Sequence, residues 1–291
     1  MSSWERRMGD GAVQASQGDL RKAIQAYDDA VGASADDQQR SRALAGRGAV
    51  RDRAGDASGR EDLEEALRLA ETADPEELFL RRHDVGVARV LSGRAASALP
   101  LLEAAWRDAP TMAQQLPSIE ALGQAYLDVG ELRQAESCFL QQLSVAQAAQ
   151  RPDAAVRAHN GRGEALRRMD RRDEAKGCFQ RVVEVLGPIQ KPDAQQCEQA
   201  GVALHNLGVL FLEARPEAAG KMLDQAVRCF VDAFGTAVHP HVARSKAFQG
   251  KLALDQGQSK QASNLFAEAL RLVDASDPIA TELVPSLRGD V

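Results

Sequence analysis

The chain has 291 residues, of which 44% are hydrophobic, 27% are charged and only 4% are aromatic. This mixture favours helices and is poor in strand-forming residues, so it excludes an all-β fold and a globally disordered chain. The 36 Lys and Arg residues against 42 Asp and Glu residues give a net charge of −6, which disfavours partners attracted by overall positive charge, namely nucleic acids and anionic membranes.

One glycine recurs in the same apolar helical context along the whole chain. Seven copies of this marker glycine lie 37 to 45 residues apart: Gly11, Gly48, Gly86, Gly123, Gly163, Gly208 and Gly250. A second glycine follows seven residues later in five of the seven repeats, whereas Asp170 and Arg215 hold that place in the other two. The second glycine suits the end of a helix, because it adopts positive φ without strain.

A second helical face follows each turn. In five repeats an alanine lies twelve residues after the marker and a large apolar residue lies four positions further on: Ala23 and Tyr27, Ala98 and Leu102, Ala135 and Phe139, Ala175 and Phe179, Ala262 and Phe266. Residues at i and i+4 share one helical face, so each repeat is predicted to be helix, tight turn, helix.

The marker glycines predict close helix packing. A glycine inside a helix costs about 1 kcal/mol relative to alanine, so its recurrence indicates that two helices approach too closely there for a side chain. We therefore expect Gly86 and Gly123 to be packing glycines. The sixth repeat carries extra residues, and the segment Glu213 to Lys221, which contains Pro216 and Gly220, is expected to form a longer loop between helices.

This pattern resembles the tetratricopeptide repeat (TPR) superfamily, most closely in the stretches from Gly86 to Ala105 and from Gly250 to Ala269. The resemblance covers roughly residues 4 to 274. It implies an all-α, right-handed superhelical solenoid of about seven repeats over residues 1–274, with residues 275–291 as a capping helix or tail. The segment Phe234 to Ala243, with its His-Pro separator, weakly resembles kinesin-light-chain-type TPR arrays.

No residue set beyond the repeat pattern indicates catalysis. Cys138, Cys178 and Cys229 each precede the large apolar residue of a second helix, which favours a packing role. His239 and His241 lack a third ligand with metal-site spacing. We therefore expect no enzyme, no cofactor and no metal.

The resemblance also implies a binding groove on the first helices of the repeats. Its lining is expected six and three residues before each marker glycine and one, four and five residues after it. In repeats 5 to 7 these positions hold the predicted peptide-binding residues Arg157, Asn160, Arg167, Arg168, His205, Val209, Leu212, Arg244 and Lys251; in repeat 3 they include His83 and Val87. The concentration of arginine favours an acidic segment. Alternatively, these arginines form a solvated face paired with Glu164, Glu213 and Asp255.

These features predict a non-catalytic protein interaction scaffold or adaptor, and neither nucleic acid nor a small molecule is expected as its partner. The alternative is an architectural subunit of a cytoskeletal or ciliary assembly that packs through convex or edge surfaces. TPR modules that clamp a chaperone carboxylate carry Asn after the marker, which this chain lacks. The absence of a membrane-spanning stretch or signal peptide, with four cysteines in no paired spacing, predicts a cytoplasmic protein.

Overall fold

The structure is a computed structural model that describes residues 2–72 and 75–273. Within these ranges all regular secondary structure is α-helical, in fourteen helices and without a strand, which confirms the all-α prediction. The expected capping helix at 275–291 lies outside the described residues.

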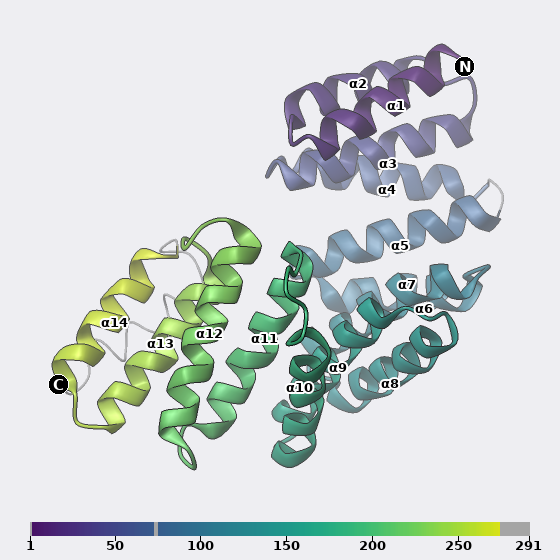
Figure 1. Cartoon of the computed structure of the whole chain (residues 1–291). Helices are drawn as coiled ribbons and strands as arrows, with labels where there is room; N and C mark the ends of the chain where they lie inside the picture. Colours follow the sequence, from purple (N-terminus) through teal and green to yellow (C-terminus); the bar gives the residue numbers. More distant parts are fainter. Residues whose placement is uncertain (1, 73–74, 274–291) are drawn as a thin grey trace. The chain divides into compact units, whose positions relative to one another are not determined.

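The chain divides into two compact units, Met1–Arg151 and Pro152–Val291, called here the N-terminal and C-terminal units. The N-terminal unit contains α1 (Ser3–Ser16), α2 (Leu20–Gly32), α3 (Asp37–Arg53), α4 (Ser58–Ala70), α5 (Pro75–Leu91), α6 (Ala95–Asp108), α7 (Met112–Val129) and α8 (Leu132–Ala148) (Figure 1). The C-terminal unit contains α9 (Pro152–Arg168), α10 (Arg172–Leu186), α11 (Ala194–Phe211), α12 (Pro216–Phe234), α13 (Pro240–Asp255) and α14 (Ser259–Arg271).

Helices pack in consecutive pairs, from α1 with α2 to α13 with α14, and neighbouring pairs stack in chain order within each unit. The first helices of successive pairs also contact one another: α1, α3, α5 and α7 in the N-terminal unit, and α9, α11 and α13 in the C-terminal unit. These two sets are called the first-helix layers below. They carry the positions at which the sequence predicts a binding groove.

The marker glycines lie where the two helices of a pair cross. A Cβ atom added at Gly86 would lie 2.6 Å from Leu102, and one added at Gly123 would lie 2.8 Å from the Phe139 ring. Both distances are shorter than a van der Waals contact, because the large residue of the second helix occupies the space that the glycine leaves. The expectation that these are packing glycines is confirmed.

In the pair α3 and α4, the glycines of the two helices face each other. A Cβ atom at Gly48 would lie 2.7 Å from the carbonyl oxygen of Gly59, and one at Gly59 would lie 2.6 Å from the carbonyl oxygen of Gly48. The contact here is backbone against backbone, so no side-chain movement can make room for a larger residue.

The predicted loop from Glu213 to Lys221 is wrong. Helix α12 already begins at Pro216, whose fixed φ suits the first turn of a helix, and Gly220 lies inside the helix. The extra residues lengthen the second helix, so the pair makes two glycine crossings, Gly208 against Leu223 and Gly201 against Phe230. The spacing of seven residues on both helices is two helical turns, which keeps both crossings on the same face.

Tight turns separate the helices of most pairs. The turn glycines of five repeats have positive φ, for example 84° at Gly130, as predicted. Asp170 takes the same left-handed conformation, with φ of 58°, without being glycine. Arg215 does not take the left-handed conformation, because the lengthened pair reaches α12 through a different connection.

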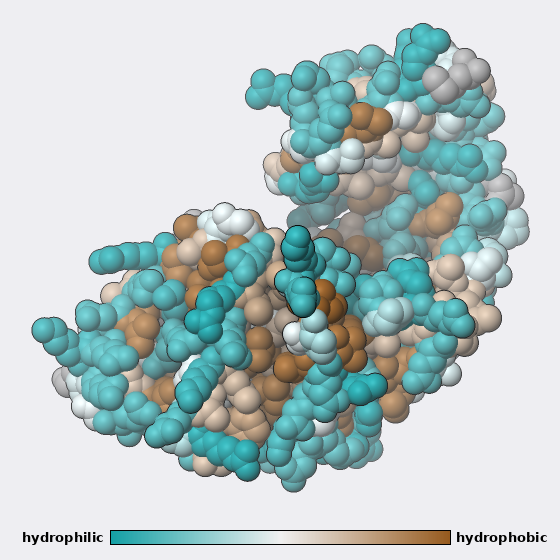
Figure 2. Space-filling model, in the orientation of Figure 1, coloured by the Kyte–Doolittle hydropathy of each residue, from teal (hydrophilic) through white to brown (hydrophobic). Residues whose placement is uncertain are grey.

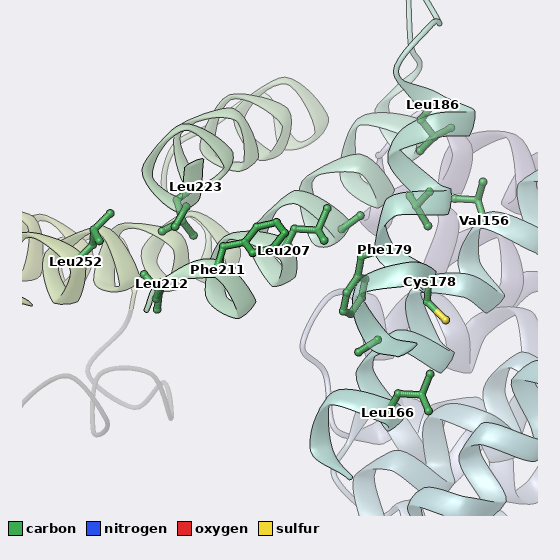
Figure 3. Close-up of a cluster of buried hydrophobic side chains, with 14 residues drawn as sticks. Val156, Leu166, Cys178, Phe179, Leu186, Leu207, Phe211, Leu212, Leu223 and Leu252 are labelled. Carbon is green, nitrogen blue, oxygen red and sulfur yellow. The ribbon is translucent and has the colours of Figure 1, made fainter. Parts of the chain in front are cut away.

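Apolar side chains fill the inside of each unit. In the C-terminal unit, Leu166, Phe179, Leu207, Leu223 and Leu252 belong to one buried cluster that joins α9, α10, α11, α12 and α13 (Figure 3). Hydrophilic side chains cover much of the visible surface, with smaller hydrophobic patches among them (Figure 2).

Candidate binding surfaces

A cavity of about 540 Å³ opens on the first-helix layer of the N-terminal unit. Its α3 wall includes Arg42, Ala45, Ala49 and Asp52, which lie six and three residues before and one and four residues after the marker glycine of that helix. Its α5 wall includes Leu80, His83, Val87 and Leu91, which lie six and three residues before and one and five residues after Gly86. The register that predicts groove positions therefore identifies a hollow in this unit, although the sequence favoured repeats 5 to 7 as the binding site.

Small residues on one wall create the hollow. Ala45 and Ala49 of α3 leave space opposite the longer side chains of α5. Among the α5 residues, Leu91 keeps 76% of its surface exposed. An open cavity with apolar walls can bind an apolar side chain of a partner molecule.

Charged groups also line this cavity. Glu77, which is fully buried beneath the surface, accepts a hydrogen bond from Arg42 Nε at 2.7 Å and lies 3.6 Å from Arg81 Nε. Arg81 Nη2 lies 3.4 Å from the carboxylate of Asp84. Burial raises the pKa of Asp84, although the positive charge of Arg81 opposes the rise.

His83 is uncharged at neutral pH. Burial lowers the pKa of its ring, and Nδ1 lies 3.2 Å from the hydroxyl of Ser118 on α7. This contact fixes the ring between α5 and α7. His83 therefore offers the cavity a neutral polar wall.

In the C-terminal unit, three of the predicted arginines are already paired. Arg167 forms a bidentate pair with Glu164 at 2.8 and 2.9 Å, and Arg168 Nε donates to the same carboxylate at 2.6 Å. Burial would raise the pKa of Glu164, but the hydrogen bonds and charges of the two arginines outweigh it and lower the pKa. Arg157 lies 3.3 Å from Asp153 on its own helix. The pairing with Glu164 is thus the one expected if these arginines form a solvated helix face rather than a binding groove.

Two polar residues of the predicted groove join helices. Asn160 is buried, and its Nδ2 donates to the backbone oxygen and to Oε1 of Gln199, which ties α9 to α11. His205 lies 2.9 Å from the hydroxyl of Ser245 and makes an edge contact with Phe248, which ties α11 to α13. Burial lowers the pKa of His205 to about 3, so the ring is neutral.

The remaining predicted groove residues differ in accessibility. Val209 is half-buried, and Leu212 is buried in the apolar cluster of this unit (Figure 3). Arg244 and Lys251 are exposed on α13, and neither has an ion-pair partner among the described residues. These two cations are therefore the predicted groove residues most open to a partner.

His239 and His241 pack against aromatic rings. His239 stacks on Phe234 at a centroid distance of 3.6 Å, and His241 stacks on Phe230 at 4.9 Å. Burial lowers the pKa of His241 to about 4. Over the described ranges no cluster of three or more His, Cys, Asp or Glu is arranged to hold a metal ion.

The four cysteines are free thiols. Burial raises the pKa of Cys138 to about 12, which makes this thiol a weak nucleophile. The lengths and hydropathy of the helices in the described part of the chain do not permit any of them to span a membrane.

Comparison with known proteins supports the resemblance read from the sequence. Residues 118–153 match the family model of the tetratricopeptide repeat, across the fourth repeat. No curated protein matches the sequence significantly.

Solved TPR structures share the fold at low sequence identity. A tetratricopeptide repeat protein from Parabacteroides merdae has a TM-score of 0.72 and 16% identity, with 99% of each chain covered. The quorum sensor NprR from B. thuringiensis, in the structure with its cognate peptide NprX, has a TM-score of 0.65 and 10% identity, covering 96% of this chain and 81% of NprR. The TPR-like repeats of a putative kinesin light chain from Podospora anserina have a TM-score of 0.52 and 17% identity, covering 68% and 95%.

Proposed function

We propose that this chain is a non-catalytic protein interaction scaffold that binds extended segments of partner proteins on its first-helix layers. The observation that carries the proposal is the cavity between α3 and α5, because it is lined at the register positions from which the sequence predicts a groove. Stacked helical repeats commonly use such surfaces for recognition. NprR, which shares the fold, has been solved in complex with its cognate peptide.

In the C-terminal unit, the proposed partner is an acidic segment. Arg244 and Lys251 support this assignment, since both are exposed and seven residues apart on α13. Each exposed ion pair contributes only about 0 to 1 kcal/mol, so several contacts must act together, and affinity should fall as salt concentration rises. Glu164 already pairs with Arg167 and Arg168. These two arginines contribute to binding only where a partner carboxylate displaces Glu164 from them.

The test is a double charge reversal, Arg244→Glu with Lys251→Glu, followed by affinity purification and quantitative mass spectrometry of bound proteins. The matched control reverses Lys221 and Arg228, which are also exposed and seven residues apart but lie on the second helix α12. The proposal predicts that the first variant loses its acidic partner and that the control retains it. Loss only in the control would instead favour an architectural subunit that packs through its outer helices.

We further propose a cytoplasmic location, supported by the four free cysteines, because thiols stay reduced in that compartment. Cells that produce the protein with a fluorescent tag provide the test. A signal confined to a secretory compartment would contradict this location.

A further inference from the structure

We infer that the cavity between α3 and α5 is a second docking site, which takes a basic partner segment presenting Lys or Arg beside an aliphatic side chain. This inference rests on the proposed scaffold function and adds a partner chemistry opposite to that of the C-terminal unit. It concerns only residues of the N-terminal unit.

Size and shape set the first requirement. A cavity of about 540 Å³ lies within the ordinary range of ligand pockets and holds a few side chains. Its apolar part is formed by the small residues Ala45 and Ala49 of α3 against Val87 and Leu91 of α5. An aliphatic partner side chain in this space would cover the exposed surface of Leu91.

The charged residues of the lining set the second requirement. Arg42 is held by Glu77 at 2.7 Å, whereas Arg81 lies at longer distances of 3.6 Å from Glu77 and 3.4 Å from Asp84. Arg81 is thus shared by Glu77 and Asp84. Asp84 accepts no hydrogen bond from the described residues. A carboxylate that lines a cavity without a hydrogen-bond donor is complementary to an ammonium or guanidinium group.

The neighbouring groups favour a cation over an anion. Asp52 places a second carboxylate on the α3 wall, and its nearest cation, Arg60, lies 4.0 Å away. His83 is neutral because burial lowers its pKa, so it adds no positive charge at neutral pH. Arg42 and Arg81 also line the cavity, but Glu77 accepts a hydrogen bond from Arg42 and lies beside Arg81, so a basic segment would give Asp84 the hydrogen-bond donor that the described residues do not supply.

The experiment is selection of a random peptide library displayed on phage against the full chain at neutral pH. Enriched peptides are then synthesised with a fluorophore, and their affinities are measured by anisotropy on purified variants. We expect enriched peptides to place Lys or Arg beside an aliphatic residue. Their affinity should fall roughly tenfold in Asp84→Asn, as expected for losing one partly desolvated charge pair, and should fall in Val87→Ser.

Asp10→Asn is the matched control, because Asp10 is an exposed carboxylate of α1 outside the cavity. This variant should bind the enriched peptides as tightly as the wild type. Circular dichroism melting verifies that each variant is folded. Acidic peptides, or basic peptides that bind Asp84→Asn and Val87→Ser as tightly as wild type, would overturn the inference and leave the scaffold function standing. Failure of the wild type to enrich any peptide would overturn both.

Discussion

Both units bury apolar clusters between their helices, but they differ in how their ion pairs are placed. In the N-terminal unit, ion pairs join neighbouring helices: Arg47 of α3 bridges Asp28 of α2 and Asp62 of α4, with Nη1–Oδ1 at 2.6 Å and Nη2–Oδ1 at 2.5 Å. Arg89 of α5 likewise pairs with Glu64 of α4 at 2.9 Å. In the C-terminal unit, Lys246 of α13 pairs with Glu268 of α14 at 2.9 Å, but pairs such as Arg167 with Glu164 lie within one helix.

The two units also differ in their histidines. Four of the five histidines lie in the C-terminal unit, where His205 and His241 are neutral bridges or stacking partners. The N-terminal unit holds only His83, whose pKa is lowered by burial, together with Asp84, whose pKa is raised by burial. Acidification therefore acts in one direction through His205 and His241, whereas the shifts of His83 and Asp84 oppose each other.

The largest expected effect is acid destabilisation of the C-terminal unit. The folded-state pKa values of His205 and His241, about 3 and 4, lie below the unfolded value of 6.5, so stability falls as the pH drops below 6.5. At pH 5 the unfolded chain binds these two protons and the folded chain does not, a loss on the order of 4 kcal/mol for the two residues together. Hydrogen exchange with mass spectrometry at pH 7 and pH 5 should show faster opening of α11 and α13 than of α3 and α4.

The variant His241→Phe is the control for the predicted acid destabilisation. Phenylalanine keeps an aromatic ring against Phe230 but cannot bind a proton, so the acid sensitivity of α13 should decrease. Equal acceleration of exchange in both units at pH 5 would contradict the difference between them.

The second effect concerns the crossing of α3 and α4, where backbone meets backbone. Gly48→Ala should destabilise the N-terminal unit by about 3 kcal/mol, because its Cβ would meet the backbone oxygen of Gly59 at 2.7 Å. Gly250→Ala in the C-terminal unit should cost less, about 1 to 2 kcal/mol, since its Cβ would meet the Phe266 ring at 2.8 Å and a ring can shift. Urea unfolding of both variants measures the difference, and equal losses would show that backbone contact is not the limiting factor.

The glycine register explains why so much of the fold follows from sequence. Glycine destabilises the interior of a helix, so its return at a fixed place in each repeat indicates a close contact, and the crossings at Gly86 and Gly123 could be predicted. The lengthened pair could not, because Pro216 and Gly220 suit a loop as well as a helix start, and only packing decides between them. The informative signal was Gly201, which lies two turns before Gly208 and meets Phe230.

The binding surfaces were less predictable. The register identified which positions line a hollow, including His83 and Val87. Ranking the repeats by positive charge favoured Arg167 and Arg168, but a sequence does not reveal whether Glu164 is oriented to pair with both. Nor does it reveal that Arg81 is shared by two carboxylates, since that depends on side-chain conformation.

The third effect tests the ion pairs between helices. Asp62→Ala should destabilise the N-terminal unit by about 2 kcal/mol, because Arg47 and Arg51 lose a nearly buried partner while Asp28 still compensates part of their charge. Glu184→Ala, which removes an exposed partner of Arg181 within α10, should cost less than about 0.5 kcal/mol. Thermal melts in low and high salt check both values, and a larger loss for Glu184→Ala would reverse the comparison.

The smallest effect lies in the turns. Asp170→Gly should stabilise the C-terminal unit by about 0.5 kcal/mol, because it relieves a left-handed residue with φ of 58°. Gly130→Asp, at the equivalent turn of the N-terminal unit, should destabilise by a similar amount. The two melting temperatures should therefore move in opposite directions, and a shift of both in the same direction would contradict a role for the left-handed backbone.

The most direct test of the scaffold function is site-specific photo-crosslinking in cells that produce the protein. A benzophenone amino acid replaces Ala49 or Lys251 on the first-helix layers, or Leu140 or Arg228 on second helices, all of which are exposed. Mass spectrometry then identifies the cross-linked proteins. We predict partner cross-links from Ala49 and Lys251 and none from Leu140 or Arg228, whereas cross-links only from Leu140 or Arg228 would contradict binding on the first-helix layers.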